Sequence, residues 1–240
     1  MLHGPQRGQF DLEFRIPAAC ADELAAGRAD IGIVPSFELT RQDLHIIPGA
    51  GIAAHGPVRS ILLVSKVPAG KIRTLATDTS SRTSVQLARV ILKQKFGAEP
   101  LMAPHPPRLE AMLQKADAAL VIGDPALHLD PATLPYRVYD LGAEWTEMTG
   151  LPMVFAVWAG RPGVTGPDVA QAFLESCRYG RERIEEIVSE EAPLRGFAPE
   201  LAREYLTRNI VHELGEREYR GLRRFLELAT GVENAAALKF

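Results

Sequence analysis

Hydroxyl groups and a guanidinium gather at residues 78–84, where the sequence reads DTSSRTS. Residues 82–96 carry apolar side chains at helical spacing and are followed by Gly97, which predicts a helix that starts in this segment. The first amides of a helix lack internal partners, and its dipole favours negative charge there. Five hydroxyls and Arg82 at such a place indicate a carboxylate site. The alternative is ordinary capping, for which one Ser or Thr is enough.

A second candidate is Ser60, the last polar residue before the wholly apolar run at 61–64. The preceding HGPVR stretch predicts a turn, and a strand without a polar face should be buried on both sides. A hydroxyl at the point where such a strand enters the core is well placed to contact a ligand. In the alternative interpretation, the turn is a surface feature and Arg59 is solvated.

Several kinds of chemistry find no support in the sequence. The six histidines form no HExxH spacing and the two cysteines are too few for a metal cluster, so we predict no metal. GxxxxGK[ST] and GxSxG are absent and no GxGxxG follows a strand, so no cofactor is predicted. The net charge of −3 argues against nucleic acid as a partner. Without a secretory signal or a bilayer-length apolar run, we predict a cytoplasmic protein with no membrane partner.

Short apolar runs alternate with helical patterns over most of the chain. This alternation predicts an α/β fold with mainly parallel sheets. Helices are expected at 18–27 and 82–96, and beyond Val164 the chain is expected to be almost wholly helical. Strands are expected at 10–16, 30–34, 46–54, 61–64, 75–78, 118–122, 136–141 and 153–158.

A weak internal repeat relates residues 27–35 to residues 114–122. Each copy reads as a helix end, an Ala-Asp turn and a buried strand, which indicates two similar α/β lobes. The alternative is a coincidence between two common helix-to-strand turns. Ligands of open parallel sheets bind beyond the carboxyl ends of the strands. Pro35-Ser36 and Gly123-Asp124 should therefore face each other across a cleft that suits a small molecule.

Four segments together resemble the chorismate dehydratases of the futalosine route to menaquinone. They read RADIGIVPSFE at 28–38, GPVRS at 56–60, DTSSRTS at 78–84 and EWTEMTGLP at 144–152. Their order and spacing match the family over nearly the whole chain. The resemblance implies the two-lobed periplasmic-binding-protein type II fold, with a substrate cleft between the lobes.

The resemblance, together with the expected strands, predicts the course of the chain through the two lobes. Lobe one is expected at 1–68 plus 155–240, and lobe two at 69–154. The chain then passes between the lobes near 66–68 and near 151–152. Two such passages permit hinge closure over a substrate.

The activity that the resemblance implies is the conversion of chorismate to 3-[(1-carboxyvinyl)oxy]benzoate by loss of water. The substrate is a small-molecule dicarboxylate, and the helix start at Arg82 is a suitable seat for one of its carboxylates. The motifs and the strand ends predict the substrate-binding residues Ser36, Ser60, Ser80, Ser81, Arg82, Thr83, Gly123 and Asp124.

The proton acceptor is not identified by these motifs. They contain no histidine or lysine that is well placed, and the nearby acids are Glu38 and Asp124. An ordinary carboxylate is a weak base for a carbon acid. A carboxylate of the substrate itself, held against the ring proton by protein hydroxyls, gains an intramolecular advantage. We therefore predict that the substrate assists its own deprotonation.

Two other functions remain open at this point: a non-catalytic solute-binding protein of the same fold, and the related dihydroxynaphthoate synthase of the same pathway. The DTSSRTS and TGLP segments favour the dehydratase. Members of that family begin with a buried strand and an asparagine-containing loop, whereas here Met1 is followed almost at once by a His-Gly-Pro turn. We therefore expect Met1 to be an internal start.

Overall fold

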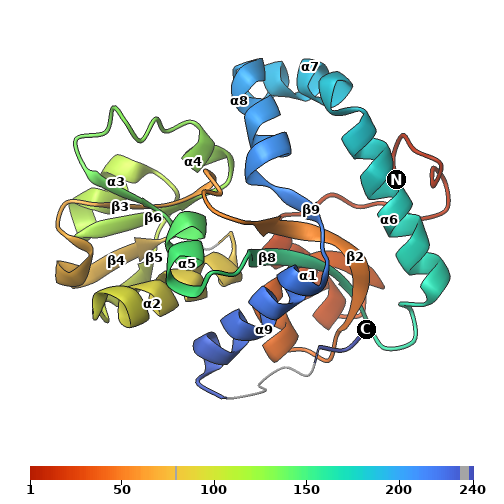
Figure 1. The fold of residues 1–240 in the computed structure, drawn as a ribbon, viewed down its shortest axis with the longest axis horizontal. Coiled ribbons are helices and arrows are strands. Elements are labelled where there is room, and N and C mark those ends of the chain that lie inside the picture. The colour runs from red at the N-terminus through yellow and green to blue at the C-terminus, as the bar shows by residue number, and fades with distance from the viewer. Residues whose placement is uncertain (79, 233–237) are drawn as a thin grey trace.

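The computed structural model describes residues 1–78, 80–232 and 238–240 of the chain (Figure 1). Its strands are β1 (Ile31–Pro35), β2 (His45–Ala54), β3 (Ile61–Ser65), β4 (Thr74–Thr77), β5 (Leu101–Pro104), β6 (Ala118–Ile122), β7 (Arg137–Asp140), β8 (Met153–Gly160) and β9 (Val211–Glu213). Its α-helices are α1 (Pro17–Ala25), α2 (Arg82–Phe96), α3 (Leu109–Lys115), α4 (Asp124–Leu127), α5 (Leu141–Thr149), α6 (Pro167–Glu182), α7 (Ile184–Leu194), α8 (Pro199–Glu204) and α9 (Glu216–Thr230). Short turns of other helical types are η1 (Ser36–Thr40), η2 (Ala69–Lys71) and η3 (Tyr205–Asn209).

The strands form two sheets, which lie in the two halves of the molecule in Figure 1. A four-stranded sheet has the order β1-β8-β2-β9, and a five-stranded sheet has the order β5-β4-β6-β3-β7. Helices α6 to α9 lie in the same half as the four-stranded sheet. The C-terminal third is therefore mostly helical, as predicted, although it also contains the short strand β9. The predicted α/β class with two similar halves is confirmed.

The expectation of mainly parallel sheets was wrong. Strand β8 runs antiparallel to both β1 and β2, and β3 runs antiparallel to both β6 and β7. Among the strand pairs that the structure describes, the parallel ones are β4 with β5 and β4 with β6. Strand β3 follows β2 of the other sheet through the turn at residues 55–60, and β8 follows β7 of the other sheet through α5. Each of the two strands runs in the opposite direction to both of its neighbours.

The first passage between the sheets also lies earlier than expected. Strand β3 belongs to the five-stranded sheet, so the chain changes sheets at residues 55–60 and not at 66–68. The second change, at residues 150–152, agrees with the expectation. Every residue of β3 is buried, as predicted for the apolar run at 61–64, and β6 and β7 flank it within the sheet. The boundary at residue 68 therefore moves to the 55–60 turn, and the rest of the division into lobes at 1–68 plus 155–240 and 69–154 stays a prediction.

Residues 10–16 do not form the expected strand. Their apolar side chains are largely in solvent, with Phe14 78% and Ile16 60% exposed. An alternating pattern supplies one apolar face, but a strand also needs a neighbour for its backbone groups. Among the described residues, no strand pairs with this segment.

The internal repeat corresponds to the same local structure in both sheets. Helix α1 leads through a turn at Asp30 into β1, and helix α3 leads through a turn at Asp117 into β6. The Asp117 carboxylate accepts hydrogen bonds from the backbone N–H groups of Arg73 and Thr74, at 2.9 and 3.1 Å. These bonds hold the entry to β4 beside that of β6 and lower the pKa of Asp117.

Helix α9 is packed tightly against the second passage between the sheets. Trp145 of α5 is fully buried, donates through Nε1 to the Pro152 carbonyl at 3.1 Å and meets Phe225 edge-on. Gly221 of α9 faces the same carbonyl so closely that a Cβ atom there would lie 2.0 Å from the Pro152 oxygen. Leu222, the next residue of α9, is fully buried. Only glycine therefore lets α9 approach this passage.

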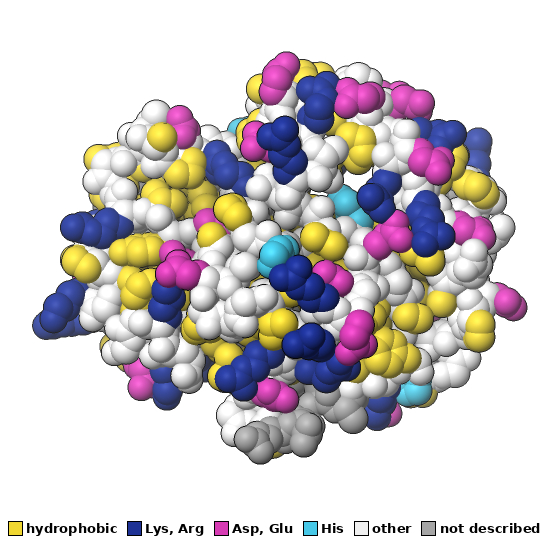
Figure 2. All heavy atoms as spheres, viewed as in Figure 1, with side chains coloured by type: hydrophobic (Ala, Val, Ile, Leu, Met, Phe, Trp, Pro, Cys, Tyr) yellow, Lys and Arg dark blue, Asp and Glu magenta, His cyan; other side chains and the backbone are white. Residues whose placement is uncertain are grey.

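The surface carries both signs of charge. Figure 2 shows Lys and Arg side chains interspersed with Asp and Glu over the visible face, in keeping with the net charge of −3. Within the described part of the chain, no helix is both long enough and apolar enough to cross a membrane.

We expect Gly221→Ala to lower the free energy of unfolding by about 1–3 kcal/mol, because the new methyl group overlaps the Pro152 carbonyl. Gly180→Ala in α6 is the matched control, since its nearest neighbour would lie 4.0 Å from the added carbon. That control should gain up to about 1 kcal/mol from helix propensity. Urea unfolding followed by circular dichroism measures both, and equal stability of the two variants would contradict the packing described.

Candidate functional site

One edge of the five-stranded sheet brings three of the predicted segments together. The register pairs Ile61 of β3 with Ile122 of β6, so Ser60 and Gly123 are neighbours. The Gly123 N–H donates to the Ser60 carbonyl at 2.7 Å. On the other side of β6, the Asp78 N–H donates to a β6 carbonyl at 3.2 Å. The ends of the parallel strands β4 and β6 and the start of β3 therefore share this edge, as the strand-end argument requires.

One carboxylate accepts two backbone hydrogen bonds from the turn before Ser60. Asp140 accepts hydrogen bonds from the N–H groups of Val58 at 2.9 Å and Arg59 at 2.6 Å, and it also caps α5 through Gly142 at 2.9 Å. Arg59 has a φ of 67°, in the left-handed region that residues other than glycine rarely adopt. Such a conformation persists where its surroundings over-determine it.

Arg59 is not the solvated side chain of the alternative interpretation. Its guanidinium donates to the backbone carbonyls of Ala126 and Leu129, in and just after α4. The turn at 55–60 is thus fastened to β7 through Asp140 and to α4 through Arg59. Ser60 itself is only 5% exposed, so its position is well defined by its neighbours.

Tyr205 is a site residue that the sequence reasoning missed. Its hydroxyl donates to Ser60 Oγ at 3.1 Å, across 145 residues of sequence. Nothing in the local sequence pattern around Tyr205 distinguishes it from a core tyrosine. Burial raises the pKa of Tyr205, so the hydroxyl keeps its proton at neutral pH.

The start of α2 shows the ordinary capping that the sequence left open, and the carboxylate site there stays a prediction. Ser81 is the N-cap and accepts hydrogen bonds from the Ser84 N–H at 3.4 Å and the Ser84 hydroxyl at 3.1 Å, which is ordinary capping. The Ser80 N–H donates to Asp78 Oδ1 at 2.9 Å. Thr79, also part of this segment, lies outside the described residues.

Thr83 and Ser36 join α2 to the end of β1. The Thr83 hydroxyl accepts from the Phe37 N–H at 3.1 Å and lies 3.4 Å from Ser36 Oγ. Ser36 in turn donates to the Val154 carbonyl of β8 at 2.7 Å. Ser36 and Thr83 are fully buried. The structure therefore brings these two predicted site residues together, from segments that belong to different sheets.

Arg82 is engaged by two carboxylates of the other half of the molecule. Its guanidinium lies 2.8 Å from Asp22 of α1 and 3.1 Å from Glu38 of η1, and both partners raise its pKa. Glu38 is 1% exposed and also accepts from Arg41 at 3.1 Å and Gln42 at 3.0 Å. The Arg82 guanidinium therefore forms ion pairs that hold α2 against α1 and η1.

Gly123 and Asp124 form the start of the short helix α4. Gly123 has a φ of 70°, a conformation that favours glycine. Asp124 is half exposed and lies 3.4 Å from Arg195 at the end of α7. Nearby, His128 stacks on Phe197 with a ring separation of 4.5 Å. These contacts link the α4 side of the five-stranded sheet to the C-terminal helices.

The predicted site residues therefore fall into two groups. Ser60, Gly123 and Asp124 lie with Tyr205 on one side, and the start of α2 lies with Ser36 on the other. That Pro35-Ser36 faces Gly123-Asp124 stays a prediction, because the hydrogen bonds of the described residues connect each group internally. No cluster of three His, Cys, Asp or Glu side chains that could hold a metal ion occurs in the ranges 1–78, 80–232 and 238–240.

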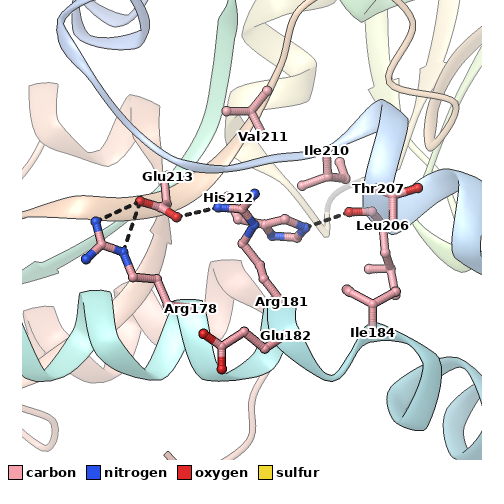
Figure 3. Close-up of a pocket in the computed structure, with 10 residues that line it drawn as sticks. All are labelled: Arg178, Arg181, Glu182, Ile184, Leu206, Thr207, Ile210, Val211, His212 and Glu213. Carbon is pink, nitrogen blue, oxygen red and sulfur yellow. Dashed lines mark hydrogen bonds and ion pairs between the residues drawn. The ribbon is translucent and has the colours of Figure 1, made fainter.

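A separate pocket of about 710 Å³ lies between α6, η3 and β9 (Figure 3). Its charged groups already have partners, because Arg178 and Arg181 both pair with Glu213. The His212 ring bonds the Leu206 carbonyl at 3.0 Å, and burial lowers the pKa of His212. None of the predicted site residues lines this pocket. It therefore does not replace the sheet edge as the candidate site.

Comparison with known proteins gives a family and two named relatives. A family model described as menaquinone biosynthesis matches residues 2–231. The chorismate dehydratase of Thermus thermophilus is 34% identical over 236 residues, which cover 91% of this chain and 86% of the relative. The chorismate dehydratase of Campylobacter jejuni is 27% identical over 237 residues, covering 96% and 90%.

Solved structures share the fold at lower identity. Protein AF1704 of Archaeoglobus fulgidus superposes with a TM-score of 0.66 at 18% identity, covering 96% of this chain and 91% of that one. The periplasmic aliphatic sulphonate binding protein of Escherichia coli superposes with a TM-score of 0.61 at 16% identity, covering 92% and 76%. These likenesses confirm the predicted periplasmic-binding-protein fold.

We expect Arg82→Ala to lower the free energy of unfolding by about 1–3 kcal/mol, because buried Glu38 loses one of its charged partners. Arg89→Ala on the same helix is the matched control, since Arg89 is exposed and its one side-chain hydrogen bond among the described residues goes to the Met102 sulfur at 4.0 Å. The control should change stability by less than about 0.5 kcal/mol. Thermal and urea unfolding measure the difference, and identical curves for the two variants would mean that the Arg82 pairs contribute nothing.

Proposed function

The chain belongs to the menaquinone-biosynthesis family, and from that premise we propose that it dehydrates chorismate to 3-[(1-carboxyvinyl)oxy]benzoate. The observation that carries the proposal is the 34% identity to a chorismate dehydratase over most of both chains. A proton leaves the ring carbon that bears the ether, and hydroxide leaves the neighbouring carbon. One C–H and one C–O bond break, a C=C bond forms, and the ring becomes aromatic. The reaction is downhill, so the enzyme has only to accelerate it.

The other two functions have weaker support. Similarity to solute-binding proteins is limited to the fold, at 16% identity for the sulphonate binding protein. The family description covers menaquinone biosynthesis in general, but both named relatives are dehydratases and not dihydroxynaphthoate synthases. As an enzyme of small-molecule biosynthesis, the protein is proposed to act in the cytoplasm.

We place the substrate at the edge of the five-stranded sheet, between the Ser60 turn and the start of α2. The substrate carries two carboxylates, and hydroxyls and backbone amides are the donors that these two places offer. The proposed contacts are Ser36, Ser60, Ser80, Ser81, Arg82, Thr83, Gly123 and Asp124. Ser36, Ser81, Thr83 and Arg82 already have partners within the protein. Ser60 Oγ accepts from Tyr205 and keeps its own hydroxyl hydrogen for a ligand, so Ser60 is the contact on which the proposal depends most.

The proton acceptor is proposed to be a carboxylate of the substrate. Glu38 is buried and accepts hydrogen bonds from three side chains, so its lone pairs are engaged. Asp124 is half exposed and paired with Arg195. A bound carboxylate positioned against the ring proton benefits from an effective molarity of about 10⁵ M or more.

Incubation of the purified protein with chorismate should convert it to 3-[(1-carboxyvinyl)oxy]benzoate in equal molar amount, as followed by chromatography and mass spectrometry. Ser60→Ala should reduce kcat/KM about 10- to 150-fold, the value of one hydrogen bond to a charged group. Ser189→Ala, on the exposed face of α7, is the matched control and should leave kcat/KM unchanged. Folded protein that forms no product would refute the proposed function. Wild-type kinetics in the Ser60 variant would remove Ser60 from the site.

Glu38→Gln and Asp124→Asn should each lose less than about tenfold in kcat if the substrate supplies the base. Removal of a general base costs about 10²- to 10⁴-fold. The measurement is kcat on folded protein below the unfolding transition, since loss of the Arg82–Glu38 pair also lowers stability. A loss of about 10³-fold or more in either variant would identify a protein base instead.

A further inference from the structure

Tyr205 is the first residue of η3, a π-helical turn, and such turns are frequent at functional sites. Its hydroxyl reaches Ser60 Oγ at 3.1 Å. The same turn is fastened to the 55–60 passage a second time, because Asn209 Nδ2 donates to the Pro57 carbonyl at 3.0 Å. Two contacts from one turn thus hold η3 over the residue on which the proposed function most depends.

The protein fixes the backbone of Ser60 without the help of Tyr205. Asp140 binds the two N–H groups before it, and the Gly123 N–H binds the Ser60 carbonyl at 2.7 Å. These contacts fix the backbone from which the Ser60 side chain extends, but the hydroxyl hydrogen still rotates about the Cβ–Oγ bond. The Tyr205 contact is the one that acts on the hydroxyl itself.

The direction of the Tyr205 hydrogen bond decides what Ser60 does. Burial keeps the tyrosine protonated by raising its pKa, and the nearby Asp124 carboxylate acts in the same direction. When the tyrosine donates, the Ser60 oxygen is the acceptor, and the Ser60 proton must turn toward another oxygen. Hydrogen bonds in a chain also polarise one another, so Ser60 becomes a better donor.

We propose that Tyr205 is a positioning residue that orients the Ser60 hydroxyl as a hydrogen-bond donor to a carboxylate of the substrate. The inference rests on the proposed function, in which Ser60 contacts that carboxylate. Tyr205 acts through Ser60 and does not itself touch the substrate. Its effect on turnover therefore depends on the presence of the Ser60 hydroxyl.

A double-mutant cycle on chorismate turnover tests this dependence. Tyr205→Phe removes only the hydroxyl and should lower kcat/KM about 2- to 12-fold in the wild-type background, the range of one net hydrogen bond. In the Ser60→Ala background the same substitution should change kcat/KM by less than about twofold. Tyr219→Phe is the matched control. Tyr219 is a buried tyrosine of α9 whose hydroxyl accepts from the Gly49 N–H at 3.0 Å, so this variant should lose stability and keep kcat/KM.

The outcomes separate the two proposals. Turnover by the wild type, with Tyr205→Phe either silent or equally harmful in both backgrounds, would overturn the positioning role and leave the proposed function intact. If the wild type binds chorismate by calorimetry without turning it over, the proposed function fails. In that case the same double-mutant cycle is measured as dissociation constants for chorismate. A Tyr205→Phe effect that depends on the Ser60 hydroxyl would then support the positioning role, and an effect that is absent or equal in both backgrounds would overturn it. Absence of both turnover and binding in folded protein would overturn both proposals.

Discussion

The carboxylate of Asp140 holds the point at which the chain passes from one sheet to the other. It accepts from two N–H groups of the incoming turn and from two at the start of α5, those of Gly142 and Ala143. These four hydrogen bonds stabilise a turn in which Arg59 has a left-handed backbone conformation. The turn leads directly into β3, which lies between β6 and β7. Ser60 is the last residue of that turn, so the interaction that organises the fold also places the hydroxyl of the proposed site.

The two halves of the molecule are linked on both sides of this passage by polar contacts from distant segments. On one side, Arg82 of α2 reaches Asp22 and Glu38. On the other, Tyr205 reaches Ser60, and Arg195 reaches Asp124. The halves also share apolar packing, because one buried cluster includes side chains of both sheets. A fold with two passages permits hinge motion. Some of the groups proposed to bind substrate are thus among those that join the halves.

This arrangement suits a dehydration in which the product ring is aromatic. In the proposed mechanism the chemistry needs a fixed geometry more than a strong base from the protein, because a carboxylate of the substrate accepts the proton. Short side chains with few rotamers, such as serine and threonine, lose little conformational entropy when they bind. Their positions here are set by backbone contacts, as for Ser60, or by buried partners, as for Thr83. Preorganised donors of this kind avoid reorganisation during the reaction.

The sequence by itself determined the α/β class, most strands, the helix at 82–96 and the resemblance to the dehydratases, because local periodicity and short motifs carry that information. The predictions that were wrong concern features that depend on the pairing of strands. The segment at 10–16 alternates as a strand does but has no partner, and β3 belongs to the sheet opposite to the one expected. Only the tertiary structure decided that Arg82 is held by Glu38, at a separation of 44 residues, and Ser60 by Tyr205, at 145. Contacts at such separations leave no periodic trace in the sequence, because their partners are chosen by the packing of whole elements and not by neighbouring residues.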